Sequence, residues 1–234
     1  MSGSHQRVCA ILPALDEAEA HPGVLAARPP GLAVIVADNG STDDTAEVAR
    51  HGGARLVHEP RRGFGSACLA GLRAAEEYDV VVYLDADRSL AWEDFDRVSA
   101  LVIDGSADLV LGARRKATRE PGSMPWHAAV ANALLGRLCG RLAGRRLHDI
   151  GPYRAIRRDS LLGRDARSRL RVAPRDDPAG RSQRTADREV PVTHRVRAGG
   201  RSKVSGRPWP TVKTGAKMTW VLLRHAAELR RGRS

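Results

Sequence analysis

Continuously apolar runs alternate with longer stretches of mixed apolar and polar residues along the first half of the chain. Such runs are typical of strands in a parallel sheet that helices cover on both faces. We therefore predict an α/β fold with a mostly parallel sheet. Its strands are expected at residues 7–12, 32–37, 54–57, 79–84 and 107–111.

Helices are expected between and after these strands. Pro13 should stop the first strand, and Asp16 and Glu17 should lie in the first turn of the next helix, where its dipole favours acids. A loop entering a strand is predicted at residues 148–154. The predicted helices include residues 16–27, 66–77, 92–103, 125–142 and 212–229.

Polar residues follow three of the predicted strands: Asp16 and Glu17, Asp38, and the pair Asp85 and Asp87. The carboxyl ends of parallel strands share one edge of the sheet, where ligands bind in such folds. Alternate residues of an extended segment point the same way, so both carboxylates of the pair can face one site.

Hard oxygen ligands at the spacing of Asp85 and Asp87 suit Mg²⁺ or Mn²⁺ that bridges a diphosphate. Asp38 could accept hydrogen bonds from a nucleotide base or ribose, or could stabilise a turn. The basic loop at residues 61–65 could contact phosphate, but it matches neither a Walker loop nor a dinucleotide-binding motif.

The formal charge of +12 is concentrated in the last third of the chain. Residues 1–156 carry 18 basic and 20 acidic residues, whereas residues 189–234 carry 11 basic and 2 acidic ones. A basic segment can bind nucleic acid, anionic lipid or phosphorylated substrates, or can be a solvated surface. Aromatic residues are few and do not alternate with basic ones, which argues against nucleic-acid binding by stacking.

Neither a signal peptide nor an apolar run of membrane-spanning length is evident, and the three cysteines lack metal-ligand spacing. We therefore expect a protein of a reducing compartment, the cytoplasm. Contact with the inner face of the plasma membrane is expected to be peripheral.

Several motifs occur in order along the chain. The earlier ones are Pro13-Ala-Leu-Asp-Glu17, Val36-Ala-Asp-Asn-Gly-Ser-Thr-Asp43, Arg62-Gly-Phe-Gly-Ser-Ala-Cys-Leu-Ala-Gly71, Leu84-Asp-Ala-Asp87 and Leu111-Gly-Ala-Arg114, and the later ones are Asp149-Ile-Gly-Pro-Tyr-Arg154 and Gly200-Arg-Ser-Lys-Val-Ser-Gly206. Together they resemble the motifs of family-2 glycosyltransferases, over residues 7–158 and again over 189–206. The later motifs are similar to those of the dolichyl- or polyprenyl-phosphate sugar synthases.

The resemblance implies a GT-A fold and a role for individual residues. Asp87 and Asp149 would be catalytic, although Asp149 could instead position other groups or be a structural cap. Arg114 and Lys203 would neutralise phosphates. Asp85 and Asp87 would bind Mg²⁺ or Mn²⁺. The implied nucleotide-sugar site comprises Pro13, Leu15, Glu17, Asp38, Asp85, Ala86, Asp87, Arg114 and Lys203.

The predicted reaction moves a hexose from a UDP- or GDP-sugar to polyprenyl phosphate, with inversion at the anomeric carbon. Residues 1–206 would form the GT-A domain, and residues 207–234 an amphipathic helical extension. One alternative is a sugar-phosphate nucleotidyltransferase, although the first strand lacks the glycine-rich loop that such enzymes need. The other is a catalytically impaired protein that binds membrane surfaces or nucleic acid through its basic tail.

Residues 163–188 depart from the family pattern, because they contain no aromatic residue and almost no helical apolar period. Two hypotheses remain open. A compensated pair of frameshifts in a GC-rich gene would produce such an arginine-rich stretch, and so would a genuine disordered basic insert.

Overall fold

The computed structural model describes residues 7–142, 147–162, 175–176, 182–183 and 188–197. Seven strands form one sheet, and two further two-residue strands pair with each other, β7 (Arg175–Asp176) with β8 (Ser182–Gln183). The strands of the sheet are β1 (Val8–Ala14), β2 (Ala33–Asp38), β3 (Arg55–His58), β4 (Val80–Tyr83), β5 (Leu109–Ala113), β6 (Arg154–Arg157) and β9 (Arg188–Pro191).

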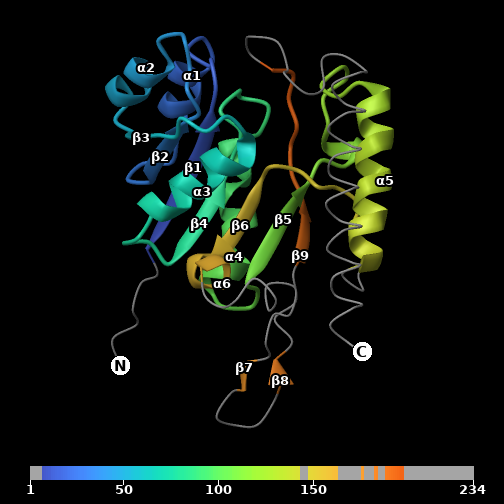
Figure 1. The fold of residues 1–234 in the computed structure, drawn as a ribbon. Coiled ribbons are helices and arrows are strands. Elements are labelled where there is room, and N and C mark those ends of the chain that lie inside the picture. The colour runs from blue at the N-terminus through green and yellow to red at the C-terminus, as the bar shows by residue number, and fades with distance from the viewer. Residues whose placement is uncertain (1–6, 143–146, 163–174, 177–181, 184–187, 198–234) are drawn as a thin grey trace.

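Helices connect most of the strands (Figure 1). The 17-residue helix α5 lies beyond β9, at the opposite side of the molecule from β3. The α-helices are α1 (His21–Ala26), α2 (Thr45–His51), α3 (Phe64–Ala74), α4 (Phe95–Ile103), α5 (Trp126–Leu142) and α6 (Arg158–Leu162), and the 3-10 helices are η1 (Trp92–Asp94) and η2 (Lys116–Thr118).

The sheet has the strand order β3-β2-β1-β4-β6-β5-β9. Strands β3, β2, β1 and β4 are parallel, and β5 is parallel to β9. Strand β6 runs antiparallel to both of its neighbours, β4 and β5. The prediction of a mostly parallel sheet is therefore confirmed.

Alternate residues of the central strands pack against helices on opposite faces of the sheet. Ala10 and Leu12 of β1 belong to a core that includes residues of α1, α2 and α4. Cys9 and Ile11 face the other side, where Leu72 of α3 completes a second core. Burial on both faces is the reason that these strands are continuously apolar rather than alternating.

The first strand does not stop at Pro13, as we had predicted, but continues to Ala14. The carbonyl of Ile11 accepts a hydrogen bond from Leu84, on the β4 side, and the carbonyl of Ala14 accepts one from Asn39, on the β2 side. Successive residues of β1 direct their backbone groups toward β4 and β2 in turn. Pro13 lies two residues after Ile11, so its nitrogen faces the same side, that of β4. Because β4 ends at Tyr83, no ladder hydrogen bond is lost there.

The helix predicted at residues 16–27 is shorter in the structure and begins at His21. The preceding residues form a loop in which Asp16 has a positive φ of 47°. The amides of Asp16 and Glu17 donate to the hydroxyls of Ser41 and Thr45. These contacts fix the two acids in a loop, rather than in the first turn of the helix.

Three expected features lie wholly or mostly outside the described residues. Lys203 and the C-terminal helix predicted at 212–229, with its extension 207–234, lie wholly outside them. The atypical segment 163–188 is described only in the short strands β7 and β8 and at Arg188, the first residue of β9.

Candidate functional site

The carboxyl ends of three parallel strands bring the predicted acidic residues to one edge of the sheet. Glu17 follows β1, Asp38 is the last residue of β2, and Asp85 and Asp87 follow β4. Strand β1 lies between β2 and β4. The loop after β1 is therefore in the middle of this edge, with one acidic strand end on either side.

Asp85 and Asp87 flank Ala86, which is buried in the main core. Because alternate residues point in opposite directions, the two carboxylates are directed away from that core. Asp87 accepts a hydrogen bond from the amide of Ser89 at 2.8 Å through Oδ1. Its other oxygen, Oδ2, is 3.2 Å from the guanidinium of Arg197.

Burial, and then the charge of Asp87, raise the pKa of Asp85 above the ordinary value for a carboxyl group. The nearby cations Arg114 and Arg197 oppose this rise. A buried carboxyl whose ionisation is disfavoured by a neighbouring carboxylate is stabilised in its ionised form by a bound cation. The chemistry of the pair therefore fits a divalent metal ion.

In the part of the chain that the structure describes, no three histidine, cysteine or carboxylate side chains form a metal-binding cluster. This agrees with the way in which Mg²⁺ is usually held, by one or two carboxylates together with substrate phosphates and water. Among the described residues, Asp85 and Asp87 are the carboxylates at the end of β4 that would hold such an ion.

Arg197 is a residue of this site that the sequence analysis missed. Its guanidinium forms ion pairs with both Glu17 and Asp87, and so bridges the loop after β1 to the loop after β4. The contact joins residues 180 positions apart in the chain, which no local pattern could indicate. The only sequence signal was its position just before the Gly200–Gly206 motif.

Arg114 follows β5 and is held by Asp149. Its Nε and Nη2 donate to the two carboxylate oxygens at 2.8 and 2.9 Å, and its backbone amide donates to Oδ2 at 2.8 Å. The Asn132 amide of α5 donates to Oδ1. The Asp149 side chain is 4% exposed and that of Arg114 is 15% exposed, so the pair is largely shielded from water.

Burial opposes the ionisation of Asp149, but the hydrogen bonds and charge of Arg114 outweigh it and lower the pKa of this carboxyl. The close approach depends on Gly151, because a Cβ there would lie 2.8 Å from the carbonyl oxygen of Gly112. Both oxygens of Asp149 already accept hydrogen bonds, an arrangement that suits positioning of Arg114 better than proton transfer.

Asp38 is buried at the end of β2. Its Oδ1 accepts a hydrogen bond from the amide of Ser41 at 3.0 Å, and its Oδ2 lies 3.2 Å from Nδ1 of His58. These contacts fit the turn that was one of the two expected roles. Two other nucleoside-pocket candidates, Pro13 in β1 and Leu15 just after it, are partly exposed at the same edge of the sheet.

Asn39, which was not among the predicted site residues, fixes the basic loop after β3. Its amide nitrogen donates to the carbonyls of Glu59 and Arg61, and its Oδ1 accepts from the amide of Gly63. The guanidinium of Arg61 pairs with Glu59, whose pKa it lowers to about 2. The loop is thus held next to Asp38, with Arg61 already engaged by a protein carboxylate.

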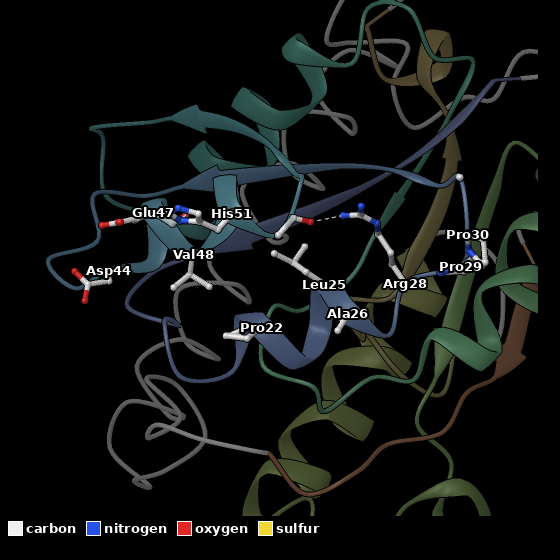
Figure 2. A pocket seen from close by; sticks show the side chains of 12 residues that line it. Pro22, Leu25, Ala26, Arg28, Pro29, Pro30, Asp44, Glu47, Val48 and His51 are labelled. Carbon is white, nitrogen blue, oxygen red and sulfur yellow. Dashed lines mark hydrogen bonds between the residues drawn. The ribbon is translucent and has the colours of Figure 1, made fainter.

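A cavity of about 810 Å³ lies elsewhere, between α1 and α2 (Figure 2). It contains none of the predicted site residues. Its lining includes Pro22, Leu25, Arg28, Glu47, Val48 and His51.

Comparison with known proteins connects this geometry to a family. Residues 10–164 match the sequence model described as Glycosyl transferase family 2. An uncharacterized glycosyltransferase of Mycobacterium tuberculosis is 41% identical over 205 residues, which cover 85% of this chain and 90% of that protein.

Two relatives have more specific names. The undecaprenyl-phosphate mannosyltransferase of Micrococcus luteus is 33% identical over 86% of this chain and 88% of its own length. The dolichyl-phosphate hexose transferase of Haloferax volcanii is 34% identical over 72% of this chain and 73% of its own length.

Among solved structures, glucosyl-3-phosphoglycerate synthase from Mycobacterium tuberculosis, in complex with Mn²⁺, UDP-glucose and phosphoglyceric acid, has a similar fold. The TM-score is 0.67 at 22% identity, over 95% of this chain and 80% of that one. The predicted GT-A fold is thereby confirmed.

Proposed function

The chain belongs to glycosyltransferase family 2, and we propose that it moves a hexose from a nucleoside diphosphate sugar to polyprenyl phosphate. The two relatives named as undecaprenyl- and dolichyl-phosphate sugar transferases support this acceptor. Family membership favours glycosyl transfer over the nucleotidyltransferase and the non-enzymatic binder that the sequence left open.

The observation that carries the proposal is the meeting of two carboxylates and two guanidinium groups at the end of β4. Asp85 and Asp87 lie within electrostatic reach of both Arg114 and Arg197. A nucleoside diphosphate needs cations for its phosphates and carboxylates for the metal ion that accompanies it. This edge of the sheet presents both.

We propose that Asp85 and Asp87 hold Mg²⁺ or Mn²⁺ when the donor binds. The ion would neutralise charge on the diphosphate as the bond to the sugar breaks. Arg114, kept in place by Asp149, would add positive charge on the side of β5. Lys203, outside the described residues, would contribute a further cation.

The nucleoside would lie across the ends of β1 and β2, against Pro13, Leu15, Glu17 and Asp38. Glu17 and Asp87 are both paired with Arg197 in the structure. Donor binding would therefore exchange a carboxylate partner of Arg197 for a phosphate, which keeps this guanidinium neutralised throughout.

The proposed reaction is a single displacement that inverts the anomeric carbon. A phosphate oxygen of the acceptor forms the new bond, and the nucleoside diphosphate leaves with the electron pair of the old one. A lipid phosphate is already an anionic nucleophile near neutral pH and so needs little help from a general base. This fits a positioning role for Asp149.

No helix among the described residues is long and apolar enough to cross a membrane. A polyprenyl acceptor would nevertheless bring the enzyme to a membrane, and we propose that it acts peripherally on the inner face of the plasma membrane. Phosphoglyceric acid, present in the structure of the synthase with a similar fold, represents a rival acceptor that is soluble.

Calorimetric titration with UDP-glucose and GDP-mannose tests the donor site. With Mn²⁺ present we expect one of the two to bind, and we expect Asp87→Asn to weaken that binding roughly tenfold or more. Asp96→Asn, which changes an exposed acid on α4, is the matched control. Binding that is unaffected by both Mn²⁺ and Asp87→Asn would contradict the assigned site.

A further inference from the structure

The outward side of α5 presents large apolar side chains to solvent. Trp126 is 79% exposed, Val130 is 51% exposed and Leu134 is 59% exposed. The three residues are spaced by four, so they form one stripe along the helix. Isolated exposed apolar residues are common, but a contiguous stripe marks a surface that contacts something else.

Arg137 and Arg141 extend the same stripe, and both are exposed. At 3.6 residues per turn, the five positions fall within an arc of about 80° around the helix axis. The helix contains no acidic residue. Residues 114–142 as a whole carry six arginines and lysines but only one acid, Glu120. The stripe (Trp126, Val130, Leu134, Arg137 and Arg141) is thus apolar in its first half and cationic in its second.

The opposite side of α5 is attached to the candidate site, which fixes the direction of the stripe. The Asn132 side chain donates to Asp149 and accepts from the amide of Ile150. Gly136 lies one turn further along the same side, where an added Cβ would be 3.2 Å from the carbonyl oxygen of Leu147. The helix therefore connects the ion pair of Arg114 and Asp149 to an outer apolar and basic surface.

We propose that the stripe on α5 binds an anionic lipid surface. A helix with apolar residues, a tryptophan and arginines on one side is suited to the boundary between headgroups and acyl chains, where the cations pair with anionic lipid. The proposal rests on the proposed function for its purpose, because a polyprenyl phosphate has to be reached from the membrane.

Charge disfavours two other occupants of the stripe. In a symmetric contact between two copies, Arg137 and Arg141 of one chain would meet either the same arginines or the apolar half of the other stripe, and α5 offers no acid to pair with them. Residues 198–234 carry nine lysines and arginines and one acid, so they too would bring like charge to the stripe. An anionic bilayer is the partner that matches both the apolar and the cationic half.

Vesicle co-sedimentation of the full chain tests this proposal without any donor or acceptor. The probes are vesicles of phosphatidylcholine with about 30% phosphatidylglycerol, and vesicles of phosphatidylcholine alone. We expect the triple variant Trp126→Gln, Val130→Gln, Leu134→Gln to bind the anionic vesicles at least about tenfold more weakly. Arg137→Gln with Arg141→Gln should lower the preference for anionic over neutral vesicles by about tenfold.

The matched control is Leu69→Gln with Ile103→Gln, which changes exposed apolar residues on α3 and α4 and should leave binding unchanged. Brominated phosphatidylcholine gives a second readout. It should quench Trp126, so Trp126→Phe should retain vesicle binding but lose part of the fluorescence quenching.

Equal vesicle binding by wild type and the triple variant would overturn the proposal. The proposal would also be overturned if, in sedimentation velocity, wild type were a dimer, the triple variant were a monomer, and vesicle binding did not change. In that case a second copy of the chain would cover the stripe. Transfer to a detergent-solubilised acceptor should survive in the triple variant. Vesicle binding without transfer from any nucleotide sugar would instead refute the proposed function, whereas the proposal that the stripe binds lipid would stand.

Discussion

Replacing Asp149 with asparagine removes the charge that holds Arg114 but keeps the size of the side chain. The pair is nearly buried and is joined by three hydrogen bonds from Arg114, with a fourth from Asn132. Loss of one partner of a buried ion pair costs about 3–5 kcal/mol, because the remaining charge has no counterion. Asparagine retains one oxygen acceptor, so we expect the free energy of unfolding to fall by about 2–4 kcal/mol.

Urea unfolding followed by circular dichroism measures this loss, with Asp96→Asn as the control. A double-mutant cycle with Arg114→Gln should give a coupling energy of about 1–3 kcal/mol, because each residue serves chiefly as the partner of the other. The pH dependence adds a second criterion.

The folded-state pKa of Asp149 is lowered, so its stabilising contribution is fully present above the ordinary carboxyl pKa of about 4 and is lost as pH falls below it. The difference in stability between wild type and Asp149→Asn should therefore shrink in acid. If Asp149→Asn abolished transfer but left the unfolding free energy and its pH dependence unchanged, Asp149 would be a proton-transfer group and the positioning role would be refuted.

Three further predictions concern the rest of the site and the sheet beneath it. Arg197→Gln should raise the KM for the donor sugar roughly tenfold, because Arg197 contacts the carboxylates of Glu17 and Asp87. Arg195→Gln, which changes an exposed arginine paired with Glu93, should leave the KM unchanged. Equal KM values for the two variants would exclude Arg197 from the donor site. Burial and then the charge of Arg114 lower the pKa of His194 to about 4. As pH falls from 6.5 to 4, the unfolded state takes up a proton at this residue and the folded state does not, so His194 should cost wild type about 3 kcal/mol of stability over this range. Urea unfolding of His194→Asn should not show this loss. Gly71→Ala would place a Cβ 2.4 Å from the Ile11 side chain and should destabilise by about 1–3 kcal/mol, whereas Gly65→Ala in open space on the same helix should be neutral or stabilising in thermal unfolding.

Local patterns predicted the sheet because burial on both faces leaves a continuous apolar signal in each strand. The end of β1 was harder to predict. Pro13 usually ends a strand, yet here its nitrogen faces the side on which β4 has already ended. That fact depends on the length of a strand about 70 residues further along the chain, so the first strand alone could not reveal it.

The loop after β1 shows the same limit. Asp16 and Glu17 resemble the first turn of a helix, but hydrogen bonds to Ser41 and Thr45 hold them in a loop instead. Tertiary contacts of this kind override the preference of acids for a helix start. They also direct Glu17 toward Arg197.

The candidate site was predictable as far as strand ends define it. Asp85, Ala86 and Asp87 could be placed from an apolar strand and the alternation of side chains. Arg197 could not, because its partners come from two other loops. Asp149 was placed near the reaction centre by resemblance alone, and only the structure shows that Arg114 and Asn132 occupy its oxygens.

Transfer of labelled sugar is the measurement that tests the proposed function most directly. The purified chain would be incubated with labelled UDP-glucose or GDP-mannose, Mn²⁺, and either polyprenyl phosphate in detergent or phosphoglyceric acid. We predict label in the organic phase with polyprenyl phosphate, lost in Asp87→Asn and retained in Asp96→Asn. Label transferred only to phosphoglyceric acid, or transfer that persists at full rate in Asp87→Asn, would contradict the account.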